Sequence, residues 1–351
     1  MLTGTATATS AGIPSTSDPT LAEGEPAHPR FKMLDGWRAL SIVLVLAAHM
    51  LPLGPQRWAL NVSIGINGMA IFFALSGFLI VSVLLRNDDV ISFLIRRFAR
   101  ILPLAWTALA ISFAIQGVQG DVWLANFMFY ANLPPFWLVS WSSHYWSLCV
   151  EMQFYVLIAL VVSTLGRRGL LLIPIASVII TTARIATGTE VSIVTWFRLD
   201  EILSGGLLAL LVQGRYHSRA KLYLSRFPFW PIFVLFLMSS RPEFPWLEYV
   251  RPYLAALMIG ITIARPVSIA TPLLESAIAN YIARISFALY IIHHFTLFGW
   301  FTSDDSFVKY LKRPISMAIS LVSAHLSTFY FEDWFILRSK RWASRRAGAI
   351  S

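Results

Sequence analysis

The stretch WRALSIVLVLAAH (residues 37–49) places Arg38 and His49 in one otherwise uncharged apolar segment. In a helix, eleven residues turn through about 1100°, so the two side chains share one face, about 16 Å apart along the axis. Burying either group in a bilayer is costly, which makes intramembrane ionisable residues functional-site candidates by default. The stretch predicts a membrane-spanning helix with Arg38 at one interface and His49 near or beyond the bilayer midplane.

The composition is that of a membrane protein. Hydrophobic residues make up 57% of the 351 residues, charged residues only 13%, and the mean hydropathy is +0.66. Soluble domains are usually about a quarter charged. We therefore expect an all-α, polytopic integral membrane protein with about ten transmembrane helices. The ten apolar segments are 38–53, 64–85, 101–118, 147–165, 169–183, 194–213, 228–239, 252–264, 284–301 and 315–331.

The basic residues indicate how the chain is oriented. Lys and Arg gather in alternate connections, such as 86–100, 167–168, 215–226 (which includes Arg219) and 338–346, and are scarcer in the intervening ones. The positive-inside rule then places both termini in the cytoplasm, although a basic cluster at 309–313 falls on the opposite side. The net charge of +10 is thus mostly an orientation signal, and we expect no nucleic-acid partner.

The chain divides into three predicted parts. Residues 1–30 lack the basic and apolar regions of a signal peptide and are rich in small and polar residues, which predicts a disordered cytoplasmic tail. Residues 31–337 form the membrane domain, and residues 338–351 a basic cytoplasmic tail. Within the domain, residues 119–146 carry four Trp and no Lys or Arg, and Pro134-Pro135 breaks any helix there. We expect either a re-entrant or interfacial piece over a cavity or an aromatic-belt loop.

Polar residues in the fourth segment lie on one helical face. Ser147 and Glu151 are four residues apart, and Tyr155 continues the same stripe. Cys149 is the only cysteine and faces elsewhere, which argues against a cysteine acyl-enzyme working with this pair. Glu151 is expected either to orient or charge-stabilise a histidine, or to join a buried hydrogen-bond network that holds helices together.

Three arginines open the third segment on the cytoplasmic side: Arg96, Arg97 and Arg100. They could clamp the phosphates of an anionic donor through bidentate hydrogen bonds. Plain positive-inside anchoring explains them nearly as well. The Ser76-Gly77 pair within the second segment is expected to serve close helix packing.

The segment ISFALYIIHHF (residues 285–295) carries a second group of polar side chains. Ser286, Tyr290 and His294 share a face, and His293 is within reach of Tyr290. A second histidine could complement His49, or it could be an ordinary core or interface histidine.

The remaining acidic pairs, Asp200-Glu201 and Glu332-Asp333, lie at edges of apolar segments, where we expect them to be exposed. The sequence contains no Gly-rich phosphate loop, HExxH run or G-x-S-x-G elbow, so soluble hydrolase or kinase chemistry is unsupported. One cysteine allows neither an intrachain disulfide nor a cysteine metal cluster, and no metal is expected.

Six strings occur in order over about residues 33–335: MLDGWRALSIVLVLAAH, FFALSGFL, FLIRRFARILPL, YWSLCVEMQFY, FRLDEILSGGLLA and ISFALYIIHH. Together they resemble the acyltransferase 3 family, integral membrane O-acyltransferases that modify bacterial surface polysaccharides, lipid-linked sugars, signalling glycans and some antibiotics. The resemblance implies ten core helices, acyl-CoA as the usual donor and transfer to a hydroxyl.

The family's motifs can be carried over residue by residue. They fall on Arg38 and His49 (Arg-x10-His), Arg97 and Arg100 (RxxR), Ser147 and Glu151 (Ser-xxx-Glu), and Ser286, Tyr290 and His293 (SYxxYxxH-type). Phe287 replaces the usual Tyr of the last signature, and Phe295 stands where a proline commonly follows. The terminal ErP-like motif is altered to FEDW at residues 331–334.

We therefore expect transfer of an acyl group, acetyl in the first place, from acyl-CoA to a hydroxyl of a carbohydrate such as an exopolysaccharide, O-antigen or lipid-linked glycan. His49 would be the general base that takes the hydroxyl proton, or a transient acyl carrier. Glu151 would orient or stabilise His49, and Ser147 would support it. The residues expected to bind donor or acceptor are Arg38, Arg97, Arg100, Tyr290 and His293.

Acyl-CoA is expected as a co-substrate, with no cofactor permanently bound. CoA is cytoplasmic whereas His49 lies deep or outward, so an acyl or pantetheine arm would have to reach into the membrane. The other expected partners are the lipid bilayer and a carbohydrate or glycolipid acceptor. The resemblance implies a multi-pass protein of the bacterial inner membrane.

Two other functions stay open. The same motifs would serve O-acylation of a small secondary metabolite such as a macrolide. A glycolipid transporter is a different class, but transport alone gives no reason for Arg-x10-His and Ser-xxx-Glu together. A purely structural role is disfavoured by the intramembrane charges.

Overall fold

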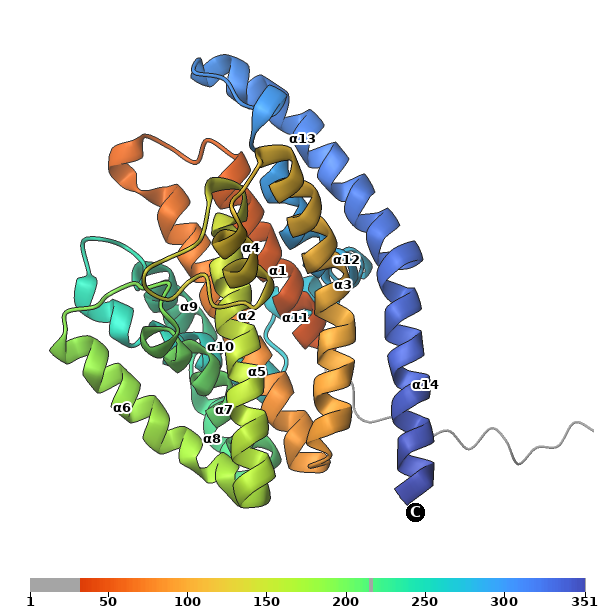
Figure 1. The fold of residues 1–351 in the computed structure, drawn as a ribbon. Coiled ribbons are helices and arrows are strands. Elements are labelled where there is room, and N and C mark those ends of the chain that lie inside the picture. The colour runs from red at the N-terminus through yellow and green to blue at the C-terminus, as the bar shows by residue number, and fades with distance from the viewer. Residues whose placement is uncertain (1–31, 215–216, 351) are drawn as a thin grey trace, which may run out of the picture. The chain divides into compact units, whose positions relative to one another are not determined.

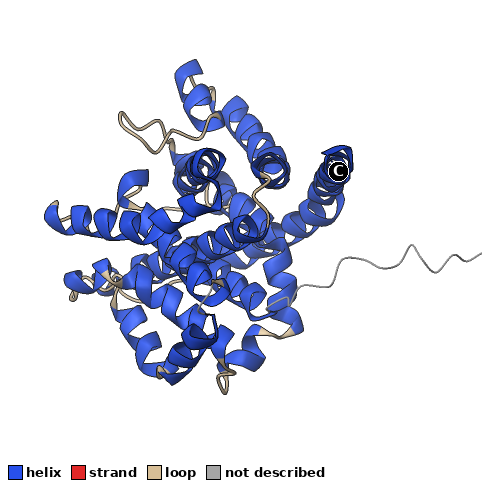
Figure 2. Ribbon diagram, turned by 90° about the horizontal axis from the view of Figure 1, so that it is seen from below, coloured by secondary structure: helices blue, strands red, loops and turns tan. Residues whose placement is uncertain are grey.

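The computed structural model describes residues 32–214 and 217–350, with side chains up to residue 343. This part is helical and contains no strand (Figures 1 and 2). The tail predicted for residues 1–30 lies outside the described residues. The α-helices are α1 (Lys32–Met50), α2 (Leu60–Arg86), α3 (Val90–Gln116), α4 (Gly120–Phe127), α5 (Trp146–Leu165), α6 (Ile173–Ala186), α7 (Leu199–Gln213), α8 (His217–Arg226), α9 (Phe229–Met238), α10 (Arg251–Ala264), α11 (Ala270–Leu274), α12 (Ala277–Phe295), α13 (Ser306–Leu326) and α14 (Asp333–Ile350).

Each of the ten predicted apolar segments overlaps an α-helix, so the all-α class is confirmed for the described residues. Within the described residues, five helical stretches are long and apolar enough to cross a membrane, or six if the bent pair α8 and α9 is one span. The protein therefore has the helices of a membrane protein, while the count of ten spans stays a prediction. Large apolar side chains on α6, such as Ile175, Val178 and Ile179, are exposed, as a lipid-facing surface requires.

Helix α3 begins earlier than predicted. Its N-cap is Asp89, whose side chain accepts a hydrogen bond from the backbone N–H of Ser92 at 3.1 Å. Residues 96–100 therefore lie inside the helix rather than at its start, and their side chains have the regular spacing of a helical face. Apolarity alone placed the start at residue 101 because the first turns of α3 carry the arginines.

Helix α1 packs against α2 and α12, and α2 packs closely along α7. At the α2–α7 crossing, glycines bring the two backbones together. A Cβ added at Gly77 would lie 1.8 Å from the carbonyl oxygen of Ile202, and one at Gly205 would lie 1.8 Å from that of Ala74. The packing role predicted for the Ser76-Gly77 pair is thus confirmed for Gly77.

The prediction that Asp200 and Glu201 are exposed is wrong. Both are almost fully buried at the start of α7 and form ion pairs. Asp200 pairs with Arg184, and Glu201 pairs with Arg198 at 3.2 Å and with Arg251 at 3.4 Å. Buried charges are tolerated because each has a partner of opposite sign.

The C-terminal region is one long bent element. Helices α13 and α14 are joined by a π-helical turn, η8 (Ser327–Glu332), and α14 packs against α3 (Figure 1). Glu332 is buried and accepts hydrogen bonds from Ser327 and Thr328, so its predicted exposure is also wrong. Asp333 is less buried and pairs with Arg284 at 3.0 Å. The predicted tail boundary at 337/338 falls inside α14.

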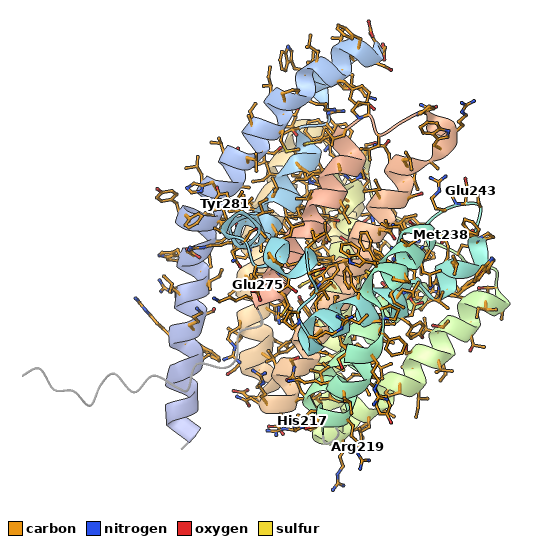
Figure 3. All side chains as sticks on the ribbon, turned by 180° about the vertical axis from the view of Figure 1, so that it is seen from behind. His217, Arg219, Met238, Glu243, Glu275 and Tyr281 are labelled. Carbon is orange, nitrogen blue, oxygen red and sulfur yellow. The ribbon has the colours of Figure 1, made fainter. Side chains whose placement is uncertain are left out.

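The two ends of the helical bundle carry different loops. Figure 3 shows His217 and Arg219 at one end and Glu243 at the other. The Arg241 guanidinium donates to the carbonyl of Trp58 at 2.5 Å, which ties the loop after α1 to the loop after α9. The His49 end of α1 therefore lies on the same side as Glu243, opposite the predicted cytoplasmic residue Arg219.

Candidate active site

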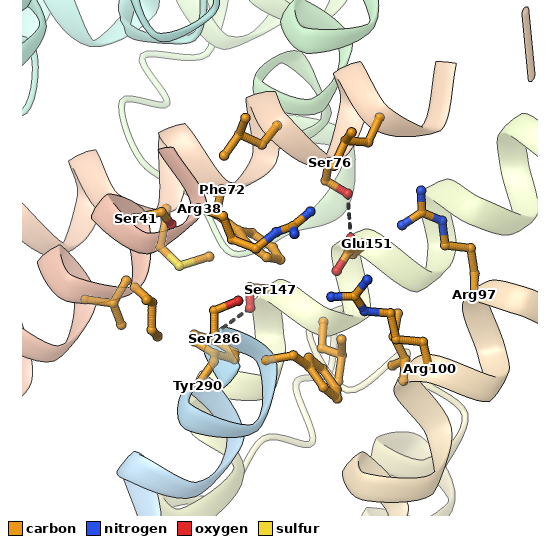
Figure 4. Close-up of a pocket in the computed structure, with 18 of the residues that line it drawn as sticks. Arg38, Ser41, Phe72, Ser76, Arg97, Arg100, Ser147, Glu151, Ser286 and Tyr290 are labelled. Atoms are coloured by element: carbon orange, nitrogen blue, oxygen red, sulfur yellow. Dashed lines mark hydrogen bonds between the residues drawn. The ribbon is translucent and has the colours of Figure 1, made fainter. Parts of the chain in front are cut away.

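A pocket of about 80 Å³ lies between α1, α2, α3, α5 and α12. The predicted residues that line it are Arg38, Arg97, Arg100, Ser147, Glu151 and Tyr290. Figure 4 shows the side chains of Arg38, Arg97 and Arg100 reaching toward Glu151 from two helices. Arg38 also forms an ion pair with Asp35 at 3.4 Å. Three guanidinium groups still outnumber the carboxylates of Glu151 and Asp35, which leaves the pocket positively charged and suits an anionic ligand. We call it the arginine pocket.

Arg96 does not line the arginine pocket and is exposed. The three neighbouring arginines of α3 therefore differ in position: two line the arginine pocket and one faces outward. Arg97 also lies over the rings of Phe93 and Tyr155, 5.8 Å from each centroid. The anchoring interpretation fits Arg96, whereas Arg97 and Arg100 are placed to contact a ligand.

Glu151 is buried and its carboxylate is held by two hydroxyls. The Oε1 atom accepts hydrogen bonds from Ser76 Oγ and from Tyr155 OH, both at 2.5 Å. These partners differ from the expected one, because His49 lies in a neighbouring cavity and contacts His293 instead. The structure thus favours the second interpretation of Glu151, a network that joins α2 to α5.

The neighbouring cavity is larger, about 600 Å³, and is lined by His49, His144, His294, Asn61, Trp146 and Arg198 among others. We call it the histidine cavity. Asn61 donates to the carbonyls of Ala48 and Leu51 at 2.7 and 2.8 Å, which fixes the end of α1 where His49 stands. His49 is exposed to this cavity, which provides space for an acceptor.

Three histidines from three segments line the histidine cavity, and a fourth, His293, is fully buried beside His49. His49 Nδ1 lies 3.1 Å from His293 Nε2, and the His294 ring is 6.0 Å from that of His49, centroid to centroid. His144, in the turn η3 (Ser140–Tyr145), lies 4.3 Å from the His294 ring. Ligand atoms of His49, His293 and His294 lie within 4.8 Å of one another, so these are the described residues that could hold a metal ion.

The two cavities adjoin along one face of α1. Val45, Met69 and Tyr290 line both of them. The Tyr290 hydroxyl lies 2.5 Å from Ser147 Oγ and donates to the carbonyl of His144 at 2.6 Å. Arg38 and His49 therefore line two cavities that share a wall, and both lie along the face of α1 that their spacing predicts.

Sequence reasoning missed Ser76 and His144 as residues of the site. Ser76 was assigned to packing, and His144 stood in a loop whose position was open. His294 was singled out because it shares a face with Tyr290, although it carries no family motif. The hydrogen bond from Ser76 to Glu151 spans 75 positions in sequence, so helical spacing gave no signal for it.

A family model described as an acyltransferase domain, Acyl_transf_3, matches residues 31–332. The chain belongs to the acyltransferase 3 family. The predicted family assignment is thereby confirmed over most of the chain, and the match includes every residue of the arginine pocket and the histidine cavity.

Curated relatives of this acyltransferase 3 chain include three bacterial proteins. The peptidoglycan O-acetyltransferase OatA of Listeria monocytogenes serovar 1/2a is 30% identical over 149 residues, which are 35% of this chain and 23% of the relative. YrhL of Bacillus subtilis (strain 168), provisionally named a peptidoglycan O-acetyltransferase, is 31% identical over 37% of this chain and 23% of the relative. A provisionally named O-acetyltransferase of Staphylococcus aureus (strain COL) is 30% identical over 38% and 24%.

The matched stretch thus spans about a quarter of the length of each of these relatives. No solved structure matches this acyltransferase 3 chain.

Proposed function

We propose that this acyltransferase 3 protein transfers an acyl group, acetyl in the first place, from acyl-CoA to a hydroxyl of a carbohydrate. The observation that carries the proposal is the pair of adjoining cavities, one lined by arginines and the other by histidines, separated by Tyr290. The relatives named as O-acetyltransferases, two of them for peptidoglycan, support acetyl transfer to a glycan.

The arginine pocket is the proposed entry for the donor. Arg97 and Arg100, with Arg38 across the pocket, would bind phosphates of acyl-CoA through bidentate, charge-assisted hydrogen bonds. The pantetheine arm would then extend past Tyr290 toward the histidine cavity. This route would let a cytoplasmic donor reach a histidine deep in the membrane domain.

His49 would carry out the proton transfer. In the proposed step it takes the proton of the acceptor hydroxyl while the hydroxyl oxygen bonds to the thioester carbonyl carbon. The carbon–sulfur bond then breaks, and the CoA sulfur leaves with the proton returned by His49. In the alternative, the His49 ring nitrogen that would accept the proton attacks the thioester instead and carries the acyl group.

We also propose the setting of the reaction. The protein would be a multi-pass protein of the bacterial inner membrane, with acyl-CoA entering from the cytoplasm and a carbohydrate or glycolipid acceptor in the histidine cavity. The bilayer surrounds the exposed apolar helix faces. No nucleic acid takes part.

The test uses membranes that contain wild type, His49→Ala or His325→Ala, supplied with acetyl-CoA labelled in the acetyl group. His325 is the matched control, because it lies on α13, contacts Tyr281 and lines neither cavity. We expect label in a base-labile ester with wild type and His325→Ala, and none with His49→Ala. The acceptor panel contains glycans, lipid-linked glycans and a macrolide.

Two outcomes would contradict the proposal. If correctly folded wild type moves no label from acetyl-CoA or longer acyl-CoAs, the donor is wrong and glycolipid transport is the next function to test. If the macrolide alone is acylated, the reaction stands but the carbohydrate acceptor does not.

A further inference from the structure

The hydrogen bonds of His293 fix which of its nitrogens carries the proton. His293 Nδ1 lies 2.7 Å from the carbonyl oxygen of Tyr290 and 3.1 Å from that of Leu289. A carbonyl oxygen can only accept, so Nδ1 must carry the hydrogen. His293 is fully buried, where the neutral ring is the less costly form. A neutral imidazole has one N–H, so His293 Nε2 carries a lone pair.

The same reasoning extends to His49. Its Nδ1 atom lies 3.1 Å from the His293 Nε2 lone pair, so His49 Nδ1 is the donor of this contact. A neutral His49 ring then carries its own lone pair on Nε2. His49 therefore donates to the buried His293, and His293 donates to the backbone of α12. Because His49 is exposed to the histidine cavity, its Nε2 lone pair is the cavity end of this chain of hydrogen bonds.

The geometry of the two rings is that of an in-plane hydrogen bond. Their planes are inclined by only 16°, and their centroids lie 5.3 Å apart. The distance between the centroids is longer than the 3.1 Å between the two nitrogens by about two ring radii, one for each imidazole. Both nitrogens therefore lie near the line that joins the two rings, and the His293 lone pair is directed at His49 Nδ1.

We infer that His293 is a positioning residue for His49: it holds the tautomer in which His49 Nε2 is the basic nitrogen of the histidine cavity. The inference rests on the proposed function for the identity of the reaction. His293 also stabilises the imidazolium that forms when His49 takes the acceptor proton, because the Nδ1–H···Nε2 bond strengthens when its donor becomes charged. Carboxylates play this part in other histidine bases; here a second, backbone-anchored imidazole replaces the carboxylate.

A metal ion held by His49, His293 and His294 is the competing explanation of the cluster. One observation counts against it. The His293 lone pair is directed at a neighbouring nitrogen rather than at a point shared by three ligands. The Nε2 atom of His294 donates to the carbonyl of Ser140 at 3.0 Å, so the ligand atom that His294 could offer is Nδ1, which has no hydrogen-bond partner.

The experiment compares His293→Phe and His293→Gln with wild type. Phe fills the space of the ring but accepts no hydrogen bond, whereas Gln brings a carbonyl oxygen toward the position of Nε2. The matched control is His325→Phe, outside both cavities. We measure kcat and KM for acetyl-CoA against pH, and separately the rate at which diethyl pyrocarbonate modifies His49, followed by peptide mass spectrometry. The second readout needs no enzyme activity.

We expect His293→Phe to lower kcat by about 10²-fold, toward the lower end of what general-base catalysis contributes, with little change in KM. The acid limb of the pH profile moves to lower pH, because the imidazolium of His49 has lost its acceptor. Modification of His49 slows as well. His293→Gln recovers most of the rate and of the modification, and His325→Phe changes neither.

Other outcomes separate the inference from the proposed function. A folded His293→Phe protein with wild-type kcat, pH profile and His49 modification overturns the inference and leaves acyl transfer intact. A wild type that transfers no acyl group overturns the proposed function, while the modification rates still decide the inference. One equivalent of tightly bound transition metal in wild type, lost in His293→Phe, overturns the hydrogen-bond assignment.

Discussion

Glu151 combines two tasks at the scale of a single residue. Its carboxylate faces the three guanidinium groups of the arginine pocket, and its Oε1 atom accepts hydrogen bonds from α2 and from its own helix. A buried carboxylate needs hydrogen-bond donors to offset its desolvation. The Ser76 hydroxyl therefore stabilises the fold by donating to Glu151, in addition to lining the arginine pocket.

We expect Ser76→Ala to lower the free energy of unfolding by about 1–3 kcal/mol, the cost of leaving a buried acceptor short of a donor. The matched control is Ser286→Ala. The Ser286 hydroxyl also lines the arginine pocket but donates within its own helix, to the carbonyl of Ala283 at 2.8 Å, so its loss costs little. Thermal unfolding of the purified proteins in detergent measures both; equal shifts would argue against the Glu151 network.

A second prediction at this scale separates the arginines of α3. Arg97→Lys and Arg100→Lys should each raise KM for acyl-CoA by about tenfold with little change in kcat, because lysine lacks the bidentate fork that matches a phosphate. Arg96→Lys is the control, since that side chain is exposed and outside the pocket. An equal effect of all three substitutions on KM would indicate a general surface-charge effect instead of a donor site.

Sequence spacing placed most of the site residues but not their partners. Arg38 and His49 lie on one face of α1 because an eleven-residue interval returns to the same face, and this is visible in sequence. The buried pairs of Glu201 with Arg198 and Arg251 were missed. Arg251 lies 50 positions away, so only the packing of α7 against α10 brings the charges together.

At the scale of elements, the α2–α7 crossing depends on two glycines. We expect Gly77→Ala and Gly205→Ala each to destabilise the protein by about 1–3 kcal/mol or more, because a methyl group would meet a carbonyl oxygen of the facing helix and force the backbones apart. Gly120→Ala is the control, with no atom within 4 Å of the added carbon. Detergent-solubilised variants compared by thermal unfolding test this; an unchanged Gly205→Ala would mean that the crossing is looser than described.

Apolar runs predicted where the helices are, and they failed where a helix carries charge. The start of α3 was missed because arginines occupy its early turns, although the cap at Asp89 was a readable signal. Helix α14 was missed for the same reason, because the residues after 337 are basic. One side of α14 packs against α3, and this contact is visible only in the structure.

At the scale of the whole molecule, the orientation in the membrane is open to a direct test. The chain has one cysteine, Cys149, which is fully buried, so we expect it to give no background labelling. In spheroplasts, a membrane-impermeant maleimide should label Glu243→Cys at once and Arg219→Cys only after permeabilisation, because these residues lie at opposite ends of the bundle (Figure 3). The reverse pattern would place the histidine cavity on the cytoplasmic side.

The shared wall of Val45, Met69 and Tyr290 has a consequence for the fate of CoA. In the proposed reaction, acyl-CoA enters on the arginine-pocket side of this wall and the acceptor lies in the histidine cavity. Only the acyl group would then pass from the donor side to the acceptor side. CoA would stay on the side from which it entered, and its free thiol would be ready to be acylated again there.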